Sequence, residues 1–264
     1  MTTVNPGTAG SRTAVSPLIG REARRLARHP VLWLALAVAA AASALDAASA
    51  GRNAGYWYGT IFTAVAFFGP IFALFAANLV ASGARRGRAD EILSVTPTSD
   101  TRRTWAVCLG VALLLAATGV IGVGAMALID ALNDIPPQDL MTAGELAQLP
   151  LVLAGAGLLG VLAARWLPFA GGVLLTFVPA TLGGVGLFNR FDSGIWWMWW
   201  TTGQTFEGHA PVPGRPWLHV AYLFGLCACA AVAAVYRHAR WTRLALIGAP
   251  VVAVTLAVGW LQLS

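Results

Sequence analysis

The chain has 264 residues, of which 58% are hydrophobic and 11% are charged, and its mean hydropathy is +0.70. Soluble domains carry about 25% charged residues, so this composition excludes an ordinary soluble fold and predicts a membrane protein. All 17 basic residues are arginine, which gives a net charge of +6 without a single lysine. A phosphate-binding P-loop requires a lysine that reaches the terminal phosphates of the nucleotide. The chain therefore cannot form that ATP site by itself, and it cannot form a Schiff base.

The first 29 residues divide into a polar tail and a basic helix. Residues 1–15 are polar and rich in turn-forming residues, which predicts a disordered cytoplasmic tail. At helical spacing, residues 16–29 place four arginines on one face: Arg21, Arg24, Arg25 and Arg28. We expect this amphipathic helix to lie in the membrane interface with its arginines among anionic headgroups. An ordinary positively charged anchor and a gating or coupling element both remain open.

Seven apolar stretches follow, each near the length that a helix needs to cross the hydrocarbon core, about 17–25 residues. They are Val31–Ala50, Tyr56–Ser82, Thr104–Ala131, Glu145–Trp166, Leu167–Phe188, Trp217–Tyr236 and Leu244–Leu261. Pro168 disfavours helix at the residue before it, so the fourth and fifth stretches are separated by a turn or a kink. The predicted fold class is all-α, a polytopic transmembrane helix bundle of six to seven spans with an N-terminal interfacial amphipathic helix.

The arginines orient these spans. If the seven stretches alternate, fourteen of the seventeen arginines lie on one side of the membrane, and the other side keeps Arg52, Arg190 and Arg215. Cytoplasmic loops carry the excess of arginine. We therefore expect a multi-pass protein of the inner (plasma) membrane, with a cytoplasmic N-terminus and an outer C-terminus.

A cluster of tryptophans occupies the predicted outer loop between the fifth and sixth stretches: Trp196, Trp197, Trp199 and Trp200. Tryptophan favours the headgroup level, because its ring is apolar and its N–H is polar. The cluster predicts an interfacial or re-entrant outer segment, and a surface for lipid or substrate exit remains an alternative.

Catalytic motifs are missing from the sequence. The four histidines are not spaced as a helical metal pair, and the cysteines lie inside apolar stretches. Asn78 is the main polar residue inside a span, and this scarcity of intramembrane charge argues against a proton-driven pump. We expect no catalytic, metal or cofactor site in this chain, and no nucleic-acid partner.

The longest predicted cytoplasmic connection is the loop 83–103. It predicts a short helix from about Arg88 to Val95 that Pro97 ends, after which Thr98, Ser99 or Asp100 caps the third span. We expect this short helix to expose Ile92, Leu93 and Val95 beside Asp90 and Glu91, which suits a surface that docks a soluble partner.

An arginine, an acidic pair, Ile-Leu-Ser-x-Thr-Pro and then Ser-x-x-Arg-Arg make up this loop. The pattern resembles the cytoplasmic loop of type-2 ABC transporter permeases, the membrane subunits of exporters driven by a separate ATPase. The resemblance implies an ATPase-coupling role for Arg88, Asp90, Glu91, Ile92, Leu93, Ser94 and Pro97. It also implies two ATPase subunits that bind ATP and magnesium, and a second permease chain in a homodimer or heterodimer.

The chain departs from that family at its C-terminal end, where the family usually closes with six spans and an inner C-terminus, and Leu244–Leu261 predicts a seventh. Under this reading, residues 16–264 form one permease domain that moves an amphipathic substrate, and the chain itself is not an enzyme. Two other classes stay open: an ATP-independent secondary transporter or channel, and an intramembrane enzyme.

Overall fold

The computed structural model describes residues 15–34, 37–38, 41, 54–86, 99–133, 135, 140–167, 169, 171–178, 215–237 and 241–262. The described elements are α1 (Val15–Ala27), α3 (Ala54–Thr63), the π-helix η2 (Ala64–Phe68), α4 (Gly69–Arg86), α6 (Asp100–Asn133), α7 (Ala143–Leu146), α8 (Gln148–Trp166), α10 (Pro216–Val235) and α11 (Trp241–Leu261). Within these ranges no residue forms a strand, which agrees with the predicted all-α class.

Among the residues that the structure describes, five helical segments are long and apolar enough to cross a membrane: Trp57–Gly83, Asp100–Asn133, Ala143–Trp166, Pro216–Val235 and Thr242–Leu261. They coincide with five of the seven apolar stretches of the sequence. The other two stretches, 31–50 and 167–188, lie largely outside the described residues, as does the predicted tail 1–15. An all-helical bundle whose long helices are apolar enough to cross a membrane is therefore confirmed.

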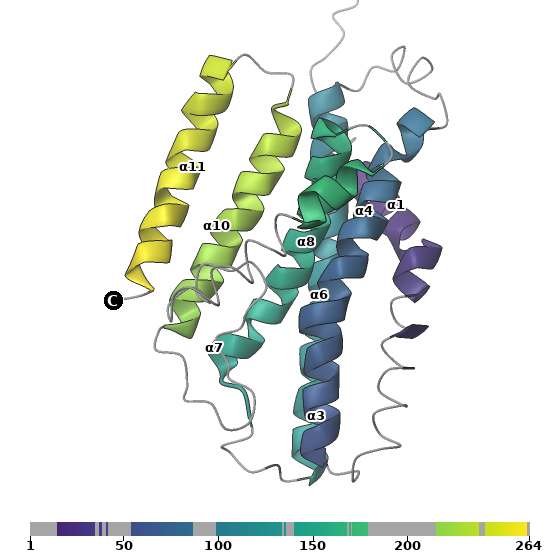
Figure 1. The fold of residues 1–264 in the computed structure, drawn as a ribbon, viewed down its shortest axis with the longest axis vertical. Helices are drawn as coiled ribbons and strands as arrows, with labels where there is room; N and C mark the ends of the chain where they lie inside the picture. The colour runs from purple at the N-terminus through teal and green to yellow at the C-terminus, as the bar shows by residue number, and fades with distance from the viewer. Residues whose placement is uncertain are drawn as a thin grey trace, which may run out of the picture.

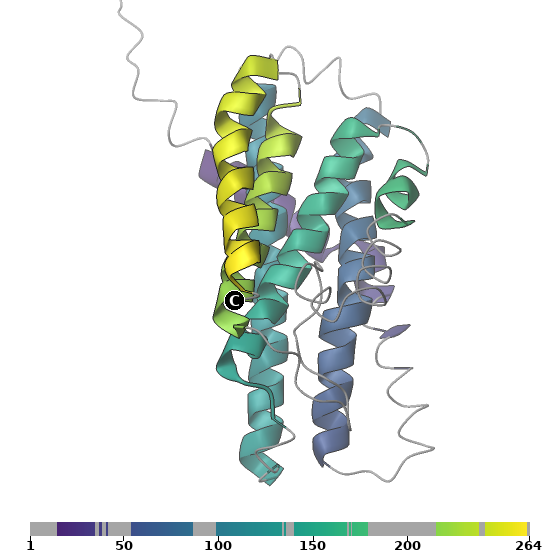
Figure 2. The same ribbon diagram turned by 60° about the vertical axis from the view of Figure 1, so that its left-hand side comes forward.

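The helices of the bundle form two groups that run in opposite directions. α8 packs alongside α4 and α10 in the same direction: Asn78 of α4 contacts Gly160, and Cys227 of α10 contacts the carbonyl of Leu151. α6 and α11 run the opposite way, and Figures 1 and 2 both show α11 side by side with α10.

The helix ends fall into two groups, at opposite ends of the bundle. α4, α8 and α10 finish, and α6 and α11 begin, at the upper end in Figure 1, which we call the Arg165 end. α3, α7 and α10 begin, and α6 and α11 finish, at the opposite end, which we call the His219 end.

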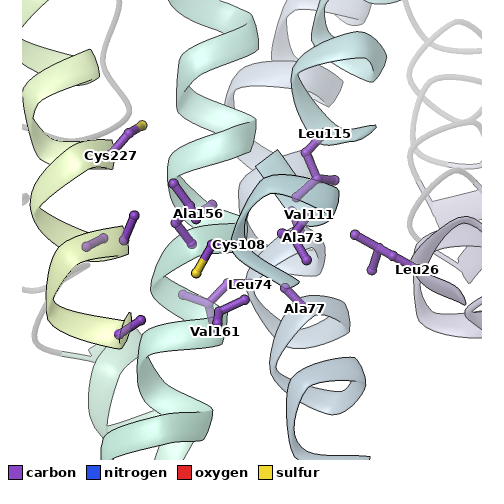
Figure 3. Packing of buried hydrophobic residues seen from close by; sticks show 14 of the residues in the cluster. Leu26, Ala73, Leu74, Ala77, Cys108, Val111, Leu115, Ala156, Val161 and Cys227 are labelled. Atoms are coloured by element: carbon purple, nitrogen blue, oxygen red, sulfur yellow. The ribbon is translucent and has the colours of Figure 1, made fainter. Parts of the chain in front are cut away.

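The central core is made of small and branched apolar side chains from α4, α6, α8 and α10. α8 is the central helix, because 67% of the most apolar part of its membrane-length segment is buried. In α11 the buried share of the corresponding part is 11%, so α11 lies at the edge. Figure 3 shows how Leu26 of α1 reaches this core from outside, opposite Ala77 and Val111. Leu26 is fully buried, so α1 is fixed to the bundle although it lies obliquely across α4 and α6.

The second membrane-length segment contains a break in its α-helical pattern. The π-helix η2 ends two residues before Pro70, which is buried. Proline has no N–H to donate to the preceding turn, and its ring crowds that turn's carbonyl group. A wider π turn at this point accommodates the proline within a continuous helix, as π-bulges do elsewhere.

Candidate functional site

The predicted ATPase-coupling residues lie within 87–98, outside the described residues. The structure does describe both flanks of this segment. α4 ends at Arg86, and α6 begins at Asp100. The candidate cap Thr98 lies outside the described residues, whereas the hydroxyl oxygen of Ser99 accepts the N–H of Arg102, at 3.4 Å. The segment therefore leaves and re-enters the bundle at the Arg165 end.

Arg165, near the end of α8, binds the first turn of α6. Its Nη1 and Nη2 atoms each lie 3.2 Å from Oδ1 of Asp100, and Nη2 also donates to the hydroxyl of Thr104. The Arg165 side chain is 19% exposed, whereas that of Asp100 is 57% exposed. Because water screens a pair of this kind, it contributes at most about 1 kcal/mol of stability. Its geometry nevertheless connects the helix that follows segment 87–98 to the central helix.

The next residue, Trp166, makes the second connection at this end. Its indole N–H donates to the carbonyl of Ala233 in α10, at 3.0 Å. Arg165 and Trp166 together join the ends of α8 and α10 to the start of α6. In the sequence, Trp166 ends the fourth apolar stretch and Arg165 counts among the predicted cytoplasmic arginines, which does not predict these contacts. An arginine and a tryptophan side by side at the end of an apolar stretch were the available signal.

The four arginines of the predicted interfacial helix, Arg21, Arg24, Arg25 and Arg28, are all exposed. Among the described residues, they line one groove of about 670 Å³ together with Ser16, Pro17 and Gly20. We call it the arginine groove. Its one described ion pair joins Arg25 to Glu22 on the same helix, at 3.9 Å.

His29 follows the arginine face and connects α1 to the helical residues after it. Its Nδ1 atom accepts the N–H of Val31 at 3.3 Å, which requires that nitrogen to be unprotonated. Partial burial, and to a smaller degree the charge of Arg25, lower the pKa of His29 below its ordinary value. The structure therefore favours neutral histidine here.

Six described polar side chains are buried: Asn78, Thr104, Gln148, His219, Thr255 and Gln262. Asn78, which the sequence analysis identified, donates from Nδ2 to the carbonyl of Gly160 at 3.2 Å and so ties α4 to α8. His219 and Gln262 form a hydrogen bond of 2.9 Å between the start of α10 and the end of α11. Sequence reasoning missed this pair, because both residues lie at the ends of apolar stretches, where polar side chains are usually solvated.

The tryptophan cluster 196–200 lies outside the described residues. In the part of the chain that the structure describes, no group of three histidine, cysteine or acidic side chains is placed to hold a metal ion. All three cysteines are free thiols. Comparisons with family models, curated proteins and solved structures gave no match for this chain.

Proposed function

We propose that the chain is the transmembrane permease subunit of an ATP-driven ABC transporter, an exporter that moves an amphipathic substrate with energy from a separate ATPase. The observation that carries the proposal is the motif from Arg88 to Pro97, in a segment that leaves α4 and re-enters α6 at one end of a membrane-length helical bundle. A chain without lysine has no P-loop of its own, so the ATP and magnesium would be bound by the partner ATPase.

The proposed mechanism uses the contacts at the Arg165 end. Closure of the ATPase subunits would push on segment 87–98. This segment is followed directly by Ser99 and Asp100, at the start of α6. Arg165 would pass this displacement to α8, and Trp166 would pass it to α10. Because α8 packs against α4, α6 and α10, a small rotation of α8 would alter three helix interfaces at once.

We further propose seven membrane crossings. The end of α1 lies near Gly83, in the half of α4 towards the Arg165 end, whereas α3 begins at the His219 end, so residues 28–53 would have to cross the membrane. α8 finishes at the Arg165 end and α10 begins at the opposite end, so residues 167–215 would have to cross once more. With the five described helices, these give an odd number. The arginine distribution then favours a cytoplasmic location for both the N-terminus and the Arg165 end of the bundle. The C-terminus would lie outside, and the protein would lie in the plasma membrane.

The proposed assembly contains two of these permease chains, or one paired with a different permease, and two ATPase subunits. Large apolar side chains are exposed on α6, where Leu113, Ile121 and Leu132 are each at least 60% exposed. Lipid or the second permease chain would cover such a surface.

Co-purification tests the proposal. The chain would be expressed with an ATPase subunit encoded next to it, as wild type, as Glu91→Arg or Leu93→Asp, and as the control Asp139→Arg in the predicted outer loop. We expect the ATPase to co-elute with wild type and with the control, and to be lost with the two loop variants. If no ATPase binds the wild type in several detergents, the proposal fails, and an ATP-independent transporter or channel becomes the leading alternative.

A further inference from the structure

The arginine groove concentrates positive charge on one side of a short helix. Residues 16–29 contain four arginines and a single acidic residue, Glu22. The guanidinium group is planar, always charged, and presents paired donors that match two oxygens of a phosphate group. Gly20, Ser16 and Pro17 add little bulk between the arginines, and a side chain at Gly20 would meet nothing within 4 Å. The groove is therefore open to a ligand with phosphate chemistry.

The bundle fixes the orientation of this groove. α1 approaches α6 so closely at Gly110 that an added Cβ there would lie 2.8 Å from the carbonyl oxygen of Ile19 and 3.1 Å from the amide nitrogen of Ala23. Leu26 is fully buried on the same side of α1. Rotation of α1 would break these contacts, so the face that carries Arg21 and Arg24 stays exposed before any ligand arrives.

With α6 centred on the hydrocarbon core, the depth of α1 would place the groove among lipid headgroups. The 34 residues of α6 extend over about 51 Å, about 20 Å more than the hydrocarbon core, so about 10 Å of a centred helix projects at each end. Gly110 lies ten residues after Asp100, about 15 Å along α6, which is about 5 Å below the headgroup boundary. Interfacial helices bury their apolar face at about this depth. Long arginine side chains on the opposite face then reach the phosphate level.

We propose that the arginine groove binds the phosphate group of an anionic phospholipid on the membrane surface that faces the Arg165 end. The site needs no ATPase and does not depend on the proposed transport function. Arg21 and Arg24 provide the accessible guanidinium groups, while Arg25 is also engaged by Glu22 and by the end of α4 near Gly83.

Thermal unfolding of the full chain in a neutral detergent, followed by tryptophan fluorescence, tests this site. We expect phosphatidylglycerol in the micelles to raise the midpoint of the wild type, while phosphatidylcholine at the same mole fraction leaves it unchanged. The double variant Arg21→Gln/Arg24→Gln should need an about tenfold higher phosphatidylglycerol concentration for the same rise, since it loses two charge-assisted contacts. The control Arg102→Gln/Arg243→Gln removes the same charge from exposed positions elsewhere and should respond as wild type does.

Three results would overturn the proposal. The first is an equal response to phosphatidylcholine, and the second is an equal loss of response in the control variant. The third is an equal midpoint rise with inorganic phosphate at the same concentration, which would make the groove a site for a free anion. If the glutamine variant does not fold, Arg21→Lys/Arg24→Lys keeps both charges and loses only the paired donors. A wild-type response in that variant would then refute the proposed phosphate geometry.

Discussion

The crossing of α4 and α8 at Gly160 is the point where the structure makes its most demanding prediction. A Cβ atom at this position would fall on the carbonyl oxygen of Leu74 and 3.0 Å from the amide nitrogen of Asn78. Both neighbours are backbone atoms, which cannot rotate away as a flexible side chain would. Gly160→Ala therefore forces the two helices apart and also weakens the hydrogen bond from Asn78 to the Gly160 carbonyl.

The magnitude follows from these two losses. Overpacking costs about 1–3 kcal/mol, and an interhelical hydrogen bond in a membrane contributes about 0.6 kcal/mol on average. Alanine also gains about 1 kcal/mol over glycine in helix propensity. Gly124→Ala on α6 is the matched control, because it has the same propensity gain and its Cβ would meet nothing within 4 Å. The difference between the two variants is then about 1.6–3.6 kcal/mol.

Equilibrium unfolding in mixed micelles of dodecyl maltoside and dodecyl sulfate measures this difference. Since each 1.4 kcal/mol is a factor of ten, the unfolding constants of the two variants should differ by about 15- to 400-fold. Two variants of equal stability would refute the close crossing of α4 and α8, and with it the central position of α8.

Three further predictions concern the ends of the bundle. Arg165→Gln should leave ATPase co-purification intact and lower ATP hydrolysis by the reconstituted complex, and full hydrolysis in this variant would contradict the proposed transmission through Arg165 to α8. In a double-mutant cycle, the coupling of Arg165 to Asp100 should contribute less than about 1 kcal/mol to stability. Tyr58→Phe removes the phenolic oxygen that accepts the buried N–H of Met141 at 3.1 Å, so it should lower the free energy of unfolding by about 1–3 kcal/mol in the same micelle assay. An unchanged free energy of unfolding would count against this contact. Because the pKa of His29 is lowered in the folded chain, the unfolded chain takes up the proton first; the contribution of neutral His29 to stability is therefore present above about pH 6.5 and is lost as the pH falls towards the folded pKa. Between pH 7.5 and 5.5, the unfolding midpoint of His29→Gln should decrease less than that of the wild type. Equal decreases would exclude His29 as the titrating group.

The sequence predicted those parts of the fold that depend on local hydrophobicity. Five apolar stretches coincide with membrane-length helices, since about twenty consecutive apolar residues suit a helix that crosses the hydrocarbon core. A proline inside a span favours a local kink, and beside Pro70 the structure has the π turn of η2. The third span is longer than predicted, Asp100–Asn133 instead of Thr104–Ala131, because polar residues at its ends continue the helix beyond the apolar window.

The pairing of distant polar residues was beyond the reach of the sequence. Asp100 and Arg165 lie 65 positions apart, and His219 and Gln262 lie 43 apart. Hydropathy shows that each stands at the end of an apolar stretch, but it contains no information about which helices are neighbours. The packing of α8 against α6, and of α11 against α10, determines these partners, and it depends on the shape of the whole bundle.

The contacts at the two ends of the bundle differ in how easily they separate. At the His219 end, the bond between His219 and Gln262 is fully buried, so breaking it would require both polar groups to stay paired or to reach water. At the Arg165 end, the principal contact is an ion pair whose Asp100 side chain is 57% exposed, and water can replace it at little cost. If the helices separate, we therefore expect the Arg165 end to open before the His219 end. The Arg165 end is also where segment 87–98 leaves the bundle, so a partner that binds there would act on the contacts that cost least to change.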